Sequence, residues 1–261
     1  MGLVLGIDAA WTVTNPSGVA LVSTETSTPR VIRFAPSFED FVLGTSPRDW
    51  GRDTESSAGL KDVLETAAAM AGAPVDVIAV DMPIARAPVR GRRKCDHLIS
   101  QTFGGRGCAT HKPTQQRPGE VSDRFLKDAE KEGFALVTTH LQKPPRALLE
   151  VYPHVAALKL CNADYRIPYK LARRQRYWRS KNAAERLKEI RLSWDIILHF
   201  LNERLEFDLA IDCEGQSLQS WKAWEDVIDA VVCCWVGIEW LAGEAQPYGD
   251  ESSAIWVPVG S

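Results

Sequence analysis

The chain has 261 residues, of which 45% are hydrophobic, so it is long enough to bury a sizeable core. Its formal net charge of −3 excludes a general attraction to nucleic acid or membranes, so any basic surface has to be local. No signal peptide and no run of about 18 uninterrupted apolar residues is present, so we expect a cytoplasmic protein outside the membrane, with its six cysteines reduced.

The first part of the chain reads as three strands, a helix and a fourth strand. Short apolar runs at residues 3–8, 19–23 and 31–35 predict strands, and the Asn-Pro-Ser-Gly turn before the second run indicates a hairpin. An Ala- and Leu-rich run at residues 60–71 predicts a helix that stops at Gly72, followed by a buried strand at residues 75–80.

The rest of the chain alternates helices, strands and two basic stretches. We first expect a Gly- and Arg-rich loop at 83–119 with a short helix near 96–103, then a helix at 122–132 and a strand at 147–151. A run of charged residues at 165–191 leads into a helix that ends near 205. A long helix at 221–241 and an edge strand at 253–257 follow. This order predicts an α/β fold, a mixed sheet with helices packed on it.

Two of the predicted strands end in an aspartate, at Asp8 and at Asp81. One such aspartate is commonly a turn former or helix cap, but two in matching places favour a site, because ligands of open α/β sheets bind at the carboxyl ends of strands. If the strands are parallel neighbours, about 5 Å apart, the two carboxylates face each other across the sheet edge, and a divalent cation would relieve their repulsion.

The long helix contributes Asp226 and Asp229, which are three residues apart and share one face. The alternative is a solvated helix start made of Glu225 and Asp226, which explains Asp226 better than Asp229. Three or four carboxylates without histidine make a site for Mg²⁺ or Mn²⁺, and such sites suit phosphodiester hydrolysis with two metal ions.

Five motifs carry a resemblance to a known family, namely GIDAAW, VDMPIA, RRKCD, LLEVYPH and DVIDAVVC. The order of the aspartates resembles the ribonuclease H-like superfamily, and the helix motif resembles that of Holliday-junction resolvases. Taken together the motifs resemble the predicted nuclease family called domain of unknown function 429.

The resemblance implies a ribonuclease H-like fold, a five-stranded sheet whose first three strands form an antiparallel meander and whose later strands are parallel. It implies one domain over residues 1–261, with a basic loop inserted at about 83–120 and a basic helical insertion at about 160–215. It also implies that Asp8, Asp81 and Asp229 bind metal, with Asp226 as a fourth ligand. Glu150 is the acidic residue of a Glu-Val-aromatic-Pro motif of the family. It could be an extra metal ligand, a residue that supports the ligands from behind, or an ordinary strand residue that caps a turn.

Two groups of basic residues are candidates for binding nucleic acid. The alternative for such a group is that it forms the solvated face of a helix and binds nothing. The first is Arg92, Arg93 and Lys94 in the loop after the second acidic strand, and the second, interleaved with aromatic residues, is Arg173, Arg174 and Arg176.

The sequence therefore predicts a Mg²⁺- or Mn²⁺-dependent nuclease acting on RNA or DNA. One alternative is an ATP-dependent phosphotransferase of the actin and sugar-kinase type, which Ala10 disfavours because those families need glycine there. Another is a non-catalytic nucleic-acid-binding protein with the same fold. A zinc site at Cys95, His97, Cys108 and His111 is not expected, because a Cys-x-His pair is not an established spacing.

Overall fold

The computed structural model describes residues 2–12, 15–50, 58–139, 143–207, 211, 213 and 215–259. Within these ranges eight strands form one sheet in the order β3-β2-β1-β4-β6-β8-β7, with β5 also pairing with β6. The strands are β1 (Leu3–Asp8), β2 (Gly18–Ser23), β3 (Arg30–Ala35), β4 (Val77–Val80), β5 (Ala135–Leu136), β6 (Ala147–Val151), β7 (Ala245–Gly249) and β8 (Ala254–Pro258).

The sheet agrees with the predicted fold class. β1, β2 and β3 form an antiparallel meander, and β4, β6 and β8 continue from β1 as parallel strands. Six of the eight strands match strands predicted from the sequence, and only β5 and β7 were not expected. The last strand was expected at an edge and is not there: all five residues of β8 are buried, and it lies between β6 and the antiparallel β7. β7 carries Pro247 and the exposed Gln246, which suit an edge strand.

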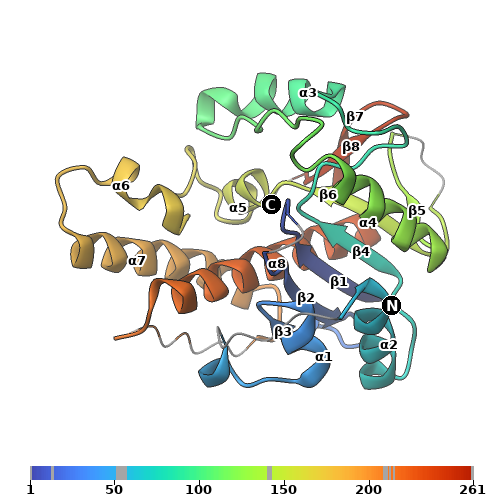
Figure 1. Cartoon of the computed structure of the whole chain (residues 1–261), viewed down its shortest axis with the longest axis horizontal. Helices are drawn as coiled ribbons and strands as arrows, with labels where there is room; N and C mark the ends of the chain where they lie inside the picture. Colours follow the sequence, from blue (N-terminus) through green and yellow to red (C-terminus); the bar gives the residue numbers. More distant parts are fainter. Residues whose placement is uncertain are drawn as a thin grey trace.

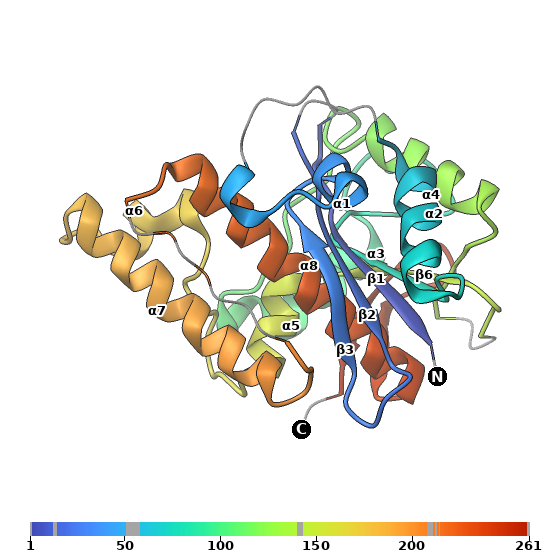
Figure 2. The ribbon, with the colours of Figure 1, turned by 90° about the horizontal axis from the view of Figure 1, so that it is seen from below.

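Helices cover both faces of the sheet (Figures 1 and 2). One face packs against α8 (Leu218–Ala242), with α5 (Pro153–Leu160) and α7 (Ala183–Asn202) beyond it, while α1 (Phe38–Leu43), α2 (Leu60–Ala71) and α4 (Glu120–Lys131) cover the other. Side chains along β1 alternate between the two cores: Val4 belongs to the α8 side, whereas Leu3 and Leu5 belong to the α2 side. Asp8, four residues after Val4, therefore lies on the α8 face.

The remaining helical segments lie outside these two layers. α3 (Lys94–Phe103) packs against β7 and β8, and α6 (Arg174–Tyr177) lies beside α7 in the part that projects from the sheet in Figure 1. Three short 3-10 turns are η1 (Pro47–Asp49), η2 (Gly104–Arg106) and η3 (Leu171–Arg173). None of the described helices combines the length and apolar character that a membrane crossing requires.

Several boundaries differ from the sequence expectations for local reasons. α2 is as predicted, and α8 is longer than predicted at both ends, since Ser217 caps its N-terminus by accepting from Ser220 N and Gly243 ends it with a φ of 82°. Pro153 is the first residue of α5, a helix that was not predicted, and its missing N–H costs nothing at that position. α1 was not predicted.

Candidate functional site

Asp8 and Asp81 lie side by side at the carboxyl edge of the sheet. β1 and β4 are parallel neighbours in which Ile7 pairs with Val80, and the amide of Asp81 donates to the carbonyl of Ile7 at 2.9 Å. Each aspartate follows an alternating strand and lies on the face covered by α8. The sequence argument for adjacent strand-end carboxylates is therefore matched by the register.

α8 brings Asp226 and Asp229 to the same edge. Asp229 is completely buried and Asp226 is 6% exposed, so neither belongs to a solvated helix start. The helix approaches so closely because β1 and β2 carry glycines under it: a Cβ on Gly18 would be 2.4 Å from the carbonyl oxygen of Asp226, and one on Gly6 would be 2.0 Å from that of Ala230. Sequence reasoning did not use these glycines.

The four aspartates interact electrostatically. Burial, followed by the charge of Asp8, raises the pKa of Asp81 well above its usual range. Burial and then Asp8 also raise the pKa of Asp226, partly through a hydrogen bond between the two carboxyl groups. Burial raises the pKa of Asp229 to about 6, although the charge of Lys170 acts in the opposite direction. The cluster thus carries more negative charge than its surroundings readily accommodate.

Two lysines neutralise part of this charge, and the sequence analysis did not place them here. Lys170 donates to Asp229 and lies 3.7 Å from Glu225, while Lys222 donates to Asp226 and lies 3.2 Å from Glu225. Burial alone would lower the pKa of Lys170, but Asp229, Tyr169 and Glu225 raise it well above its ordinary value. Lys170 belongs to the basic stretch at 165–191 that was expected to contact nucleic acid.

In the described part of the chain, neither Asp8 nor Asp81 has a lysine in direct contact. Among the residues that the structure describes, neither forms an ion pair with a lysine, arginine or histidine. Five carboxylates, including that of Glu225, therefore meet two ammonium groups. Lys170 lowers the pKa of Asp81 and Asp8 raises the pKa of both lysines, so the lysines act on the strand-end aspartates only without direct contact.

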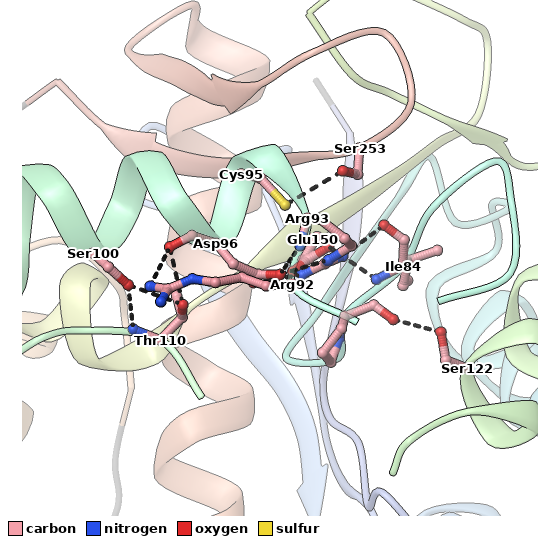
Figure 3. Close-up of polar contacts among 11 residues, drawn as sticks. Ile84, Arg92, Arg93, Cys95, Asp96, Ser100, Thr110, Ser122, Glu150 and Ser253 are labelled. Carbon is pink, nitrogen blue, oxygen red and sulfur yellow. Dashed lines mark hydrogen bonds and ion pairs between the residues drawn. The ribbon is translucent and has the colours of Figure 1, made fainter. Parts of the chain in front are cut away.

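Glu150 has a different partner, Arg93 (Figure 3), although its charge contributes to the raised pKa of Asp81. It pairs with Val80 in the sheet register and so lies on the face opposite Asp81. There Arg93 binds both of its carboxylate oxygens, at 2.5 and 2.6 Å, and the amide of Ile84 donates to it at 2.9 Å. Burial raises the pKa of Glu150 to about 7, and Arg93 opposes that change.

Cys95, Asp96 and Glu150 form a buried group whose ligand atoms lie within 4.8 Å of one another, close enough to share a metal ion. Arg93 already lies among them, however, since it also binds Asp96 at 2.9 Å. The Cys95 thiol lies 3.4 Å from the Ser253 hydroxyl, and burial raises its pKa to about 12. Of the other residues considered for a zinc site, the buried Cys108 thiol donates to the carbonyl of His154.

Asp8, Asp81 and Asp226 line a cavity of about 1610 Å³, whereas the completely buried Asp229 does not. Its polar and aromatic lining includes Asp8, Trp11, Asp81, His111, Arg117, Arg124, Tyr152, Lys170, Arg173 and Lys222. Of the predicted substrate-binding residues, Arg173 lines it and contacts His111 at 2.7 Å. Arg93 also lines the cavity, but it is bound to Glu150. A separate hollow of about 250 Å³ is lined by Arg92 and Lys94. Arg174 donates to the carbonyl of Leu171, and Arg176 is exposed.

Comparison with known proteins places the chain in a family. A search of curated proteins and a search of solved structures each returned no match. A family profile described as "Protein of unknown function (DUF429)" matches residues 6–253, which include every aspartate of the cluster, and the chain therefore belongs to this DUF429 family.

Proposed function

We propose that the protein is a divalent-metal-dependent nuclease that hydrolyses phosphodiester bonds of RNA or DNA, on a ribonuclease H-like fold. The observation that carries the proposal is the adjacency of Asp8 and Asp81 at the carboxyl edge of the sheet, partly buried and without a counter-ion among the described residues. Two such carboxylates repel each other unless a cation lies between them.

The donor set fits Mg²⁺ or Mn²⁺. Every candidate ligand is a carboxylate oxygen, the ligand that these hard cations prefer. Asp8 and Asp81 would hold the ion, joined by Asp226, whose partner Lys222 has a half-exposed side chain and can turn away into water. A bound ion would supply an activated water and positive charge for the phosphate.

The chain's own residues would position the substrate. Arg173 and His111 lie at the wall of the cavity, where a guanidinium can hold a phosphate through two parallel hydrogen bonds. Trp11 and Tyr152 also line the cavity, and aromatic rings stack on unpaired bases. Since Asp8, Asp81 and Asp226 share a cavity with these side chains, a flexible single strand suits this site better than a rigid duplex.

The local structure gives no support to the phosphotransferase alternative. Such enzymes need free main-chain amides in the turn after the first aspartate to cradle phosphate. Here the amide of Ala10 donates to the hydroxyl of Ser17 at 3.0 Å, so it is used within the turn itself.

The test is Asp8→Asn, measured by Mn²⁺ titration calorimetry and by cleavage of labelled single-stranded, duplex and branched RNA and DNA. We expect loss of both metal binding and cleavage with an unchanged circular dichroism spectrum. Asp128→Asn is the matched control, because Asp128 also lines the cavity but pairs with Lys131 at 2.7 Å away from the cluster. Cleavage retained by Asp8→Asn, or absent from the wild type on every substrate with Mn²⁺, would refute the proposal.

A further inference from the structure

We infer that Lys170 permanently occupies the place of a second cation, so that this centre binds one divalent ion and not two. The inference rests on the proposed function insofar as it assumes a metal site at Asp8 and Asp81. It changes the role of Asp229, which then holds the lysine and does not bind metal.

The contacts of Lys170 are those of a bound cation. Its ammonium group donates to Asp229 Oδ2 and lies 3.7 Å from Glu225 Oε1, while its side chain is only 18% exposed. An ammonium group in contact with two buried carboxylates takes the position of a second metal ion and supplies one of the two positive charges that such an ion would bring. Removing it would leave the buried Asp229 without an ammonium partner, which is strongly unfavourable, while Glu225 would keep Lys222 at 3.2 Å.

The backbone around Lys170 is fixed, which distinguishes this lysine from a loose counter-ion. Its predecessor Tyr169 donates through its hydroxyl to Asp229 Oδ1 at 2.6 Å, and its successor Leu171 donates through its amide to Glu225 Oε2. The carbonyl of Tyr169 also accepts from the indole of Trp194 at 3.0 Å. Each of the three consecutive residues is thus bound to Asp229 or Glu225 of α8, and Tyr169 is also bound to the buried Trp194.

These contacts also use both oxygens of Asp229. Oδ1 accepts from Tyr169 and Oδ2 accepts from Lys170. A metal ion could therefore bind Asp229 only by disturbing these hydrogen bonds. Asp8 and Asp81 have no equivalent partners in the described part of the chain. The five carboxylates therefore fall into three groups: Asp8 and Asp81 are open to a metal ion, Asp229 and Glu225 are bound to Lys170, and Asp226 is bound to the more exposed Lys222.

Lys222 provides the contrast. It too contacts two acids, Asp226 and Glu225, but its side chain is 48% exposed and it is carried on the same helix as both partners. An exposed lysine can leave its partner for water at little cost, whereas Lys170 cannot. We therefore expect Lys222 to give way to the metal ion and Lys170 to stay.

The experiment counts Mn²⁺ ions on the intact protein by equilibrium dialysis and calorimetry, and looks for a spin-coupled Mn²⁺ pair by electron paramagnetic resonance. We expect one ion and no coupled pair in the wild type. Lys170→Met, which keeps the length of the side chain without its charge, should bind two ions, and Lys170→Arg, which restores a positive charge, should bind one. Lys222→Met is the matched control and should bind one.

Two ions on the wild type, or one ion on folded Lys170→Met, would overturn the inference. If Lys170→Met does not fold by circular dichroism, the wild-type count and the coupled signal decide the matter alone. The outcomes also separate the two proposals. One bound ion without nuclease activity would refute the proposed nuclease function and support the inference about Lys170. Two bound ions with nuclease activity would support the nuclease function and refute the inference. No bound ion would refute both.

Discussion

Gly18 on β2 lies directly beneath Asp226 on α8, so close that a Cβ at residue 18 would be 2.4 Å from the Asp226 carbonyl oxygen. Gly18 also pairs with Asp8 in the β1–β2 register. One residue thus sets the distance between the strand that carries Asp8 and the helix that carries Asp226. The acidic cluster depends on this close packing as much as on its carboxylates.

Gly18→Ala should therefore damage both stability and the site. The added methyl has to push the helix main chain away from β2, and overpacking of this kind costs about 1–3 kcal/mol. We expect a lower free energy of unfolding in urea and weaker Mn²⁺ binding. Gly91→Ala is the control, because a Cβ there would meet nothing within 4 Å. Equal Mn²⁺ affinities for Gly18→Ala and the wild type would show that metal binding does not depend on the close approach of α8 to β2.

Arg93→Met should destabilise the protein strongly. It leaves Glu150 and Asp96, which are 3% and 2% exposed, without their counter-ion, and breaking a buried ion pair from one side costs about 3–5 kcal/mol. Adding Glu150→Gln should recover part of the loss, since the second variant removes one of the stranded charges. The measurement is a double-mutant cycle by urea unfolding.

The exposed pair between Lys61 and Glu65 gives the control for Arg93→Met. Its ions are 3.7 Å apart and about two-thirds exposed, so Lys61→Met should change stability by less than about 1 kcal/mol. A similarly small effect of Arg93→Met, or no recovery in the double variant, would contradict the assignment of Arg93 as the counter-ion of Glu150.

The sequence was sufficient for the sheet core and for the meeting of Asp8 and Asp81, because strand-end acids after apolar runs carry a local signal. Lys170 carried no such signal. It lies in a run of lysines and arginines that resembles a solvated surface, and its burial depends on α8, more than fifty residues later. Glu150 was ambiguous for a related reason: one residue of sheet register decides its face, and its partner Arg93 comes from a distant loop.

The cysteines should be unreactive in the folded protein. All six are buried, and burial raises the pKa of the Cys95, Cys108 and Cys161 thiols to about 12, 11 and 12 respectively, so almost no thiolate exists at pH 8. Labelling with a thiol reagent should be slow in the native state and complete in urea. Cys95→Ser should also leave Mn²⁺ binding unchanged, because Arg93 occupies the space among Cys95, Asp96 and Glu150. Fast native labelling of Cys95, or weaker Mn²⁺ binding by Cys95→Ser, would contradict this.

Arg173→Ala should weaken the binding of single-stranded substrate more than the rate of cleavage. The guanidinium lies at the cavity wall beside His111, and the loss of one charge-assisted contact to phosphate corresponds to about 1.5 kcal/mol, or about a tenfold rise in KM. The salt dependence of binding should fall by about 0.7 in log–log slope, the contribution of one phosphate contact on a single strand. Arg176→Ala is the control, since Arg176 belongs to the same basic run but is exposed on α6. If both variants weakened binding equally, the basic run would act as a diffuse charged surface, and Arg173 would not be a specific phosphate contact beside the aspartates.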